Sequence, residues 1–225
     1  AARQAAKDFK ADGFDVYLRP SDAFSTLGWF NDPLLNTSLR RDSIDLANTV
    51  IHELTHNTYY ASGQAAFNES FAMFVGARGA AAFFRSRGSD SSAKLLEARW
   101  DDDKLLAGFW ARVIRSLDSA YKAHPGDKAW RIAVRDTVYA RTRAMLVGEI
   151  APQLRTISPL YAQRTPLDNA SLLARRVYAS DLQLFDDVYE KEGRNLRHTI
   201  GRVIGLAKAR PEDPFGVIRG WVREH

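Results

Sequence analysis

The chain has 225 residues, of which 45% are apolar, enough to bury one substantial hydrophobic core. It contains no cysteine, which excludes disulfide bonds and thiolate ligands for zinc. The net charge is +5 and the pI about 9.5, but the arginines are dispersed along the predicted helices and offset locally by aspartates, which argues against a nucleic-acid-binding protein. No apolar run approaches the roughly 20 residues of a membrane-spanning helix.

The N-terminal segment is predicted to hold a helix and a small β element. Residues 1–12 have helical periodicity and end at Gly13, a favoured residue just beyond a helix. Residues 14–19 alternate in polarity and stop at Pro20, which is typical of a strand. A second extended segment is predicted at 24–30, before the turn Asn31-Asp32-Pro33.

The next predicted helix carries His52-Glu53-Leu54-Thr55-His56. Histidines four residues apart project from one face of a helix, where two imidazoles can bind one zinc ion. Glu53 would lie beside a water molecule bound to that ion, in the position of a general base. The motif therefore predicts a zinc hydrolase.

The surroundings of this motif agree with a functional helix. Asp42 or Ser43 is a suitable N-cap, and apolar residues follow helical spacing on the face away from the histidines. The face that carries the histidines is polar, whereas the buried face of a purely structural helix is apolar.

Glu69 is the predicted third zinc ligand. Ser62-Gly63 is a helix stop, and a second helix is expected to begin near Gln64. With a rise of about 1.5 Å per residue, an antiparallel second helix brings Glu69 back level with His56. Small residues on the same face would let the two helices approach closely; the face carries Ala72, Met73, Gly76 and Ala80. The alternative is a solvated carboxylate at the start of a helix.

The remainder of the chain is predicted to be helical. Residues 92–123 and 127–155 indicate a helical hairpin, broken at His124-Pro125-Gly126-Asp127. A polar connection to about Thr165 precedes three further helices, predicted at 168–191, 194–209 and 214–224. The run Asp101-Asp102-Asp103 is interpreted as an exposed helical face rather than a metal site. The predicted fold is mainly α, with a small N-terminal β element and a helical-hairpin scaffold.

These motifs resemble those of known metallopeptidases. His52-Glu53-Leu54-Thr55-His56 with Asn68-Glu69-Ser70-Phe71-Ala72 resembles the gluzincins, although the spacing from His56 to Glu69 is shorter than in the better-known members and Met73 replaces an aspartate of thermolysin-like enzymes. A closer resemblance is to a bacterial family of predicted aminopeptidases. It extends over Thr26 to Thr37, the histidine motif, Ala66 to Ala72, and Leu167 to Leu172 ahead of Tyr178.

The resemblance implies a zinc-dependent peptidase, with aminopeptidase activity as the expected form and a gluzincin-like core in one domain over residues 1–225. Its Zn²⁺ ligands would be His52, His56 and Glu69, and Glu53 would be the general base. The partner would be a peptide or protein substrate, in the bacterial cell envelope or periplasm. A further N-terminal segment is expected upstream, and any membrane association would come through a segment outside this chain.

Several assignments stay open at this stage. The oxyanion of the reaction needs a second donor, and Tyr178 is the first candidate because it lies in the segment shared with the family; the alternative is a core tyrosine. Weaker candidates are Tyr59, Tyr60, Tyr161 and His198. Residues 27–30 are either a substrate-binding edge strand or part of the core, and Asp32 is either a ligand for a substrate amine or a turn residue.

The sequence also leaves the class of activity open. Terminal and internal peptide cleavage are both compatible with the motifs. The alternative to an enzyme is a non-catalytic, zinc-stabilised binding or scaffold protein of the cell envelope, in which the metal would only lock two helices together.

Overall fold

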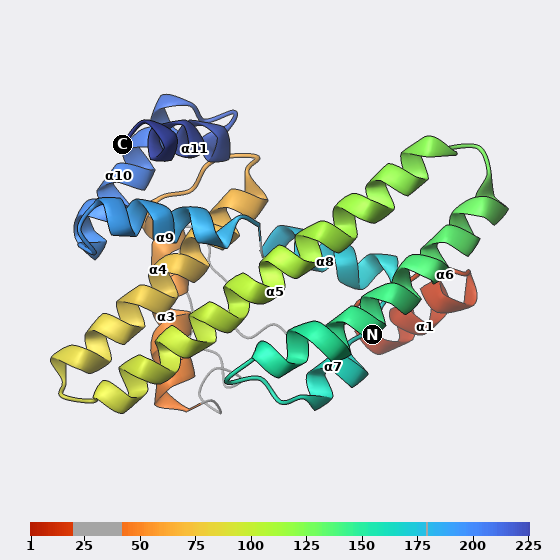
Figure 1. Cartoon of the computed structure of the whole chain (residues 1–225), viewed down its shortest axis with the longest axis horizontal. Helices are drawn as coiled ribbons and strands as arrows, with labels where there is room; N and C mark the ends of the chain where they lie inside the picture. The colour runs from red at the N-terminus through yellow and green to blue at the C-terminus, as the bar shows by residue number, and fades with distance from the viewer. Residues whose placement is uncertain (20–41, 179) are drawn as a thin grey trace. The chain divides into compact units, whose positions relative to one another are not determined.

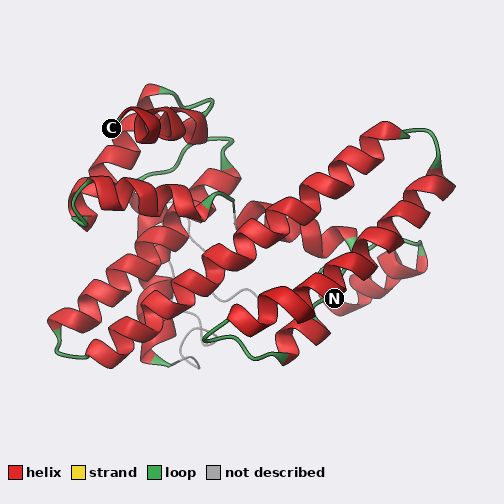
Figure 2. Cartoon of the chain, viewed as in Figure 1, coloured by secondary structure: helices red, strands yellow, loops and turns green. Residues whose placement is uncertain are grey.

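The computed structural model describes residues 1–19, 42–178 and 180–225. For Tyr178 it describes the backbone only. All regular structure in these residues is helical, and none of it is strand (Figure 2). None of the described helices combines the length and the apolar character needed to cross a bilayer. The helices, labelled in Figure 1, are α1 (Ala2–Ala11), α3 (Ser43–Thr58), α4 (Ala65–Ser86), α5 (Asp90–Ala123), α6 (Lys128–Met145), α7 (Leu160–Arg164), α8 (Asn169–Tyr178), α9 (Leu182–Lys191), α10 (Leu196–Ala209) and α11 (Pro214–Glu224).

The contacts divide the chain into two compact units. Unit 1 comprises Ala1–Arg19 and Leu105–Arg176, and unit 2 comprises Pro20–Lys104 and Val177–His225. The boundary falls within α5, so the first part of this helix belongs to unit 2 and the second part to unit 1. One domain over the whole chain stays a prediction.

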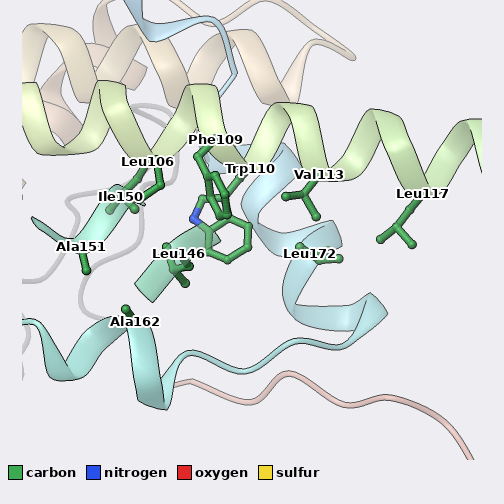
Figure 3. Packing of buried hydrophobic residues seen from close by; sticks show 10 residues of the cluster. All are labelled: Leu106, Phe109, Trp110, Val113, Leu117, Leu146, Ile150, Ala151, Ala162 and Leu172. Atoms are coloured by element: carbon green, nitrogen blue, oxygen red, sulfur yellow. The ribbon is translucent and has the colours of Figure 1, made fainter. Parts of the chain in front are cut away.

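Unit 1 has its own apolar core. The second part of α5 buries Phe109 and Trp110 against a π-helical turn that continues α6 (Leu146–Ile150) and against α8. Apolar side chains recur along α5 at helical spacing, so one face of the helix is covered from Leu106 to Leu117. Figure 3 shows ten buried side chains of this core: Leu106, Phe109, Trp110, Val113, Leu117, Leu146, Ile150, Ala151, Ala162 and Leu172.

Unit 2 is built around aromatic side chains of α4 and α9. The ring centroids of Phe67, Phe71 and Phe74 lie 5.9, 5.7 and 5.8 Å from that of Phe185. Three of these residues are spaced three or four apart on α4, which places them on one face of the helix. This face therefore fixes α4, the helix that carries Glu69, against α9.

A buried carboxylate joins three helices of unit 2. Asp186 of α9 accepts hydrogen bonds from Arg78 of α4 at 3.0 and 2.6 Å, and from Lys104 and Trp100 of α5 at 2.5 and 2.9 Å. Burial raises the pKa of Asp186, but the hydrogen bonds from Lys104 and Arg78 more than offset this and leave the pKa below its ordinary value.

The predicted N-terminal β element is not found among the described residues. Residues 2–11 form α1 and Gly13 has a φ of +85°, as expected, but residues 14–19 form no strand. A strand needs a neighbour to satisfy its backbone hydrogen bonds, and alternation alone does not supply one. The second predicted segment, 24–30, lies outside the described residues, as does Asp32.

Two helical segments after residue 155 differ from the prediction. The helix expected over 168–191 is two helices, α8 and α9, separated near Asp181, which has a φ of +53°. The backbone N–H of Ser180 donates to Ser70 Oγ at 3.0 Å, so the break is stabilised by a contact with a residue 110 positions away. Helix α7 was not predicted.

The interpretation of the Asp101-Asp102-Asp103 run was partly wrong. The run lies in α5 as expected, but Asp102 is buried and Asp103 is half-buried. Only tertiary packing determines which side of a long helix is covered.

Candidate metal centre

Helix α3 sets the positions of His52, Glu53 and His56. It begins after Asp42, whose carboxylate accepts a hydrogen bond from the backbone N–H of Asp45 at 2.8 Å, so Asp42 is the N-cap of the two candidates, and Ser43 is the first residue of the helix. The helix continues to Thr58, two residues beyond His56. Both histidines therefore lie within regular helix, where a spacing of four residues places them on one face.

The connection to α4 is held by Asn68. The backbone N–H of Ala61 donates to Asn68 Oδ1 and Asn68 Nδ2 donates to the carbonyl of Ala61, both at 2.8 Å. The turn passes through Gly63, whose φ of +75° is unfavourable for residues with a Cβ. Asn68 is buried and directly precedes Glu69. No role was predicted for Asn68 from the sequence, although it stands inside the Asn68–Ala72 motif.

Close approach of α3 and α4 is confirmed at Gly76. A Cβ on Gly76 would lie 2.6 Å from Asn48 Oδ1, 3.0 Å from the carbonyl oxygen of Asn48 and 3.4 Å from His52 Cβ. Glu69, seven residues earlier on α4, lies beside His52 and His56. The later residue of α4, Gly76, therefore lies beside the earlier part of α3, and Glu69 lies beside the later part. The two helices are antiparallel, as predicted.

The three predicted ligands converge. His52 Nε2 lies 3.2 Å from His56 Nε2, and the carboxylate oxygens of Glu69 lie 3.4 Å from His52 Nε2 and 3.7 Å from His56 Nε2. Donor atoms about 2.0–2.2 Å from a tetrahedral zinc ion are separated by about 3.3–3.5 Å. The spacing and the chemistry of the donor set therefore fit zinc. Within the described ranges this is the only group of three such residues spaced to hold a metal ion.

The centre lies near the surface of unit 2 but is not fully exposed. The side chain of His56 is 8% exposed, and those of His52 and Glu69 are 20% and 23% exposed. Burial lowers the pKa of His56 and the adjacent His52 lowers it further, while Glu69 acts in the opposite direction. A lowered pKa favours the neutral imidazole, the form that binds metals.

Glu53 and two of the tyrosine candidates lie close to the predicted ligands in the chain. Glu53 is half-buried on α3, next to His52 in the chain. The ring of Tyr60 lies 6.4 Å from the ring of His56, whereas the ring of Tyr59 lies below the ammonium group of Lys208. Of these two, Tyr60 is the one that contacts a predicted ligand.

The other candidates are placed as follows. Tyr178 is the last residue of α8, and its side chain lies outside the described residues. Ser180, two residues later, binds Ser70, the neighbour of Glu69. Tyr161 belongs to unit 1, where it accepts a hydrogen bond from Arg175, and His198 is exposed on α10.

The shared segment Leu167–Leu172 lies in unit 1. Asn169 Oδ1 accepts hydrogen bonds from the hydroxyl groups of Tyr121 and Tyr139 at 3.1 and 3.0 Å, and its backbone N–H donates to Asp15 at 2.9 Å. These bonds tie α8 to α5, α6 and the N-terminal segment. In unit 1 this segment therefore serves packing.

Comparison with known proteins gives one finding at the level of a family. A family model described as "Putative aminopeptidase" matches residues 1–214. Searches of curated proteins and of solved structures found no significant match.

Proposed function

Because the chain belongs to the family described as "Putative aminopeptidase", we propose that it is a zinc-dependent peptidase whose metal is held by His52, His56 and Glu69. The observation that carries this proposal is the convergence of these three side chains: the two Nε2 atoms lie 3.2 Å apart, and each lies 3.4–3.7 Å from a carboxylate oxygen of Glu69. Two imidazoles and one carboxylate are the ligand set of several hydrolytic zinc sites, and they leave a fourth position for water.

Zinc bound there would act as a Lewis acid and lower the pKa of a water molecule to about 7. The carboxylate of Glu53 would take the proton of the attacking water and deliver it to the amine nitrogen as the peptide C–N bond breaks. A half-buried carboxylate beside the ligands is suited to this transfer, since it keeps some access to substrate.

A second donor to the oxyanion is still needed. Tyr178 remains the first candidate, because the chain just beyond it binds Ser70, next to Glu69. Tyr60 is the second, because its ring lies 6.4 Å from that of His56. Phenylalanine variants at both positions separate them: the donor's variant should lose kcat and keep zinc.

The decisive experiment compares zinc content with hydrolysis. Purified protein should hold about one zinc per chain and cleave members of a peptide library, read by mass spectrometry. Glu53→Gln should keep the zinc and lose turnover by at least about 100-fold, the effect expected for a general base. Glu97→Gln is a matched control, because Glu97 lies on α5 and forms an exposed ion pair with Arg85 in the last turn of α4, 16 residues beyond Glu69.

The outcomes separate the two classes of function. Removal of single N-terminal residues would establish an aminopeptidase, and internal cuts an endopeptidase. Full activity of Glu53→Gln would exclude Glu53 as the base. Stoichiometric zinc without any cleavage would favour the non-catalytic zinc-stabilised protein.

A further inference from the structure

The net positive charge of the chain comes from unit 1. Unit 1 contains 16 Lys and Arg residues against 8 Asp and Glu, whereas unit 2 contains 16 against 19. The formal charges are therefore +8 and −3, and the overall +5 conceals this division. A strongly basic unit attracts anionic ligands.

Unit 1 also has an apolar hollow between α5 and α6. Its volume is about 240 Å³, and its apolar lining comes from both helices. Phe109 and Val113 of its lining are buried, whereas Met145 is 37% exposed, so the hollow reaches the surface. The residues that line it are Phe109, Arg112, Val113, Ser116, Val138, Arg141, Thr142 and Met145.

Two arginines, one from each helix, line this hollow. Arg112 of α5 and Arg141 of α6 are exposed, and neither forms an ion pair with a carboxylate of the described residues. Elsewhere in unit 1, Arg135 is paired with Asp136 and Arg176 with Asp118. The hollow therefore joins an apolar interior to cationic groups that lack an acidic partner in this part of the chain.

We propose that this hollow binds a single-chain amphiphilic carboxylate, such as a medium-chain fatty acid. The acyl chain would lie against Phe109, Val113 and Val138, and Arg112 and Arg141 would bind the carboxylate. Guanidinium groups bind carboxylates through paired N–H donors, and such charged hydrogen bonds are among the stronger ones in proteins. This site is separate from the proposed metal centre, which lies in unit 2.

The lining favours an acyl chain over other anions. A cavity of about 150 Å³ holds one benzene molecule, so 240 Å³ accommodates part of one chain. A peptide terminus would bring amide groups into a hollow in which, among the described lining residues, only Ser116 and Thr142 offer uncharged polar side chains. A nucleic acid would bind through its phosphate groups and would leave the apolar lining of the hollow uncovered.

The test uses decanoate below its micelle concentration. The chain has two methionines, Met73 in unit 2 and Met145 at the hollow, so methyl-labelled methionine gives one reporter and one internal reference. Decanoate should shift the NMR signal of Met145 in a saturable way and leave that of Met73 unchanged. Butyrate tests the need for the chain, and decyltrimethylammonium tests the need for the negative charge; neither should saturate the site.

Paired variants test the arginines. Arg112→Gln with Arg141→Gln should weaken decanoate binding by about tenfold or more, as expected for lost charged hydrogen bonds. Arg115→Gln with Lys122→Gln removes the same charge from exposed positions of α5 outside the hollow and should weaken it less than about threefold. Thermal unfolding should be alike in both double variants, since all four side chains are exposed.

A second pair tests the apolar part. Met145→Glu places a carboxylate at the mouth of the hollow and should abolish binding, read by calorimetry, while Ile132→Glu, 40% exposed on the same helix but outside the hollow, should not. The proposal is overturned if decanoate does not bind, if both double variants weaken it equally, or if only anionic vesicles or an oligonucleotide bind. Binding of vesicles or an oligonucleotide without decanoate would mean that unit 1 attracts polyanions through its overall charge and not through this hollow.

Discussion

Gly76 is the residue at which α3 and α4 come closest to a steric limit. Any Cβ there would meet both the side chain and the backbone carbonyl of Asn48, on the turn of α3 that precedes His52. Gly76→Val should therefore push the helices apart, reduce stability by about 1–3 kcal/mol and weaken zinc binding. Zinc titration and urea unfolding measure the two effects.

A matched glycine separates packing from helix propensity. Gly201 lies inside α10, and a Cβ added there would have no neighbour within 4 Å. Gly201→Val should leave zinc affinity unchanged. Equal loss of zinc affinity in both variants would contradict the role of close approach at Gly76.

Asp103 gives unit 2 a pH-dependent stability. Burial, together with the nearby charge of Asp102, raises its pKa to about 7, while Arg99 acts against the shift. Between about pH 4 and 7 the unfolded chain has lost this proton and the folded chain keeps it, so the free energy of unfolding should fall as the pH rises. The fall attributable to Asp103 is at most about 4 kcal/mol.

Asp103→Asn should flatten this part of the profile. The variant should match the parent protein near pH 4 and be more stable than it above pH 7, as measured by urea unfolding across the pH range. Asp136→Asn, at an exposed position of α6, should leave the profile unchanged. An unaltered slope in Asp103→Asn would show that Asp103 ionises normally in the folded protein.

At the scale of the elements, the buried carboxylate of Asp186 links α9 to α4 and α5. Asp186→Ala would leave Arg78 and Lys104 without their buried counter-charge and Trp100 Nε1 without its acceptor. Removing one partner of a buried ion pair costs about 3–5 kcal/mol, so the variant should lose that much stability in urea unfolding.

The adjacent residue provides the control. Asp187 also lies on α9, but its carboxylate accepts an exposed hydrogen bond from Gln183 rather than a buried ion pair. Asp187→Ala should change stability by less than about 0.5 kcal/mol. A similar loss of stability in both variants would mean that the substitutions weaken α9 itself and not the ionic contacts of Asp186.

At the scale of the whole molecule, metal removal should affect one unit and spare the other. The three proposed ligands all belong to unit 2, while unit 1 has its own apolar core. A ligand present at 1,000 times its Kd stabilises the folded state by about 4 kcal/mol. Chelation should therefore accelerate hydrogen exchange in α3 and α4 and leave α6 and α8 unchanged.

Hydrogen exchange followed by mass spectrometry measures this difference peptide by peptide. Faster exchange spread evenly over both units would contradict it and would indicate one cooperative domain. No change anywhere would mean that the three side chains do not hold a metal that matters for stability.

The sequence by itself determined the features that depend on neighbouring residues. The start of a helix at Asp42 or Ser43, the helix over the histidine motif and the return of the chain to Glu69 follow from spacings within a few turns. The connection between α3 and α4 is short, and short connections join helices that pack side by side. For this reason a metal centre could be predicted without a structure.

Tertiary structure decided what depends on distant residues. The division of charge between two units, the burial of Asp102, the partners of Asp186 and the break near Asp181 all rest on contacts between segments far apart in the chain. The strand predicted at 14–19 is absent for the same reason. Local patterns fix which face of a helix or strand is apolar, but the neighbour that covers that face is selected by the packing of the whole unit.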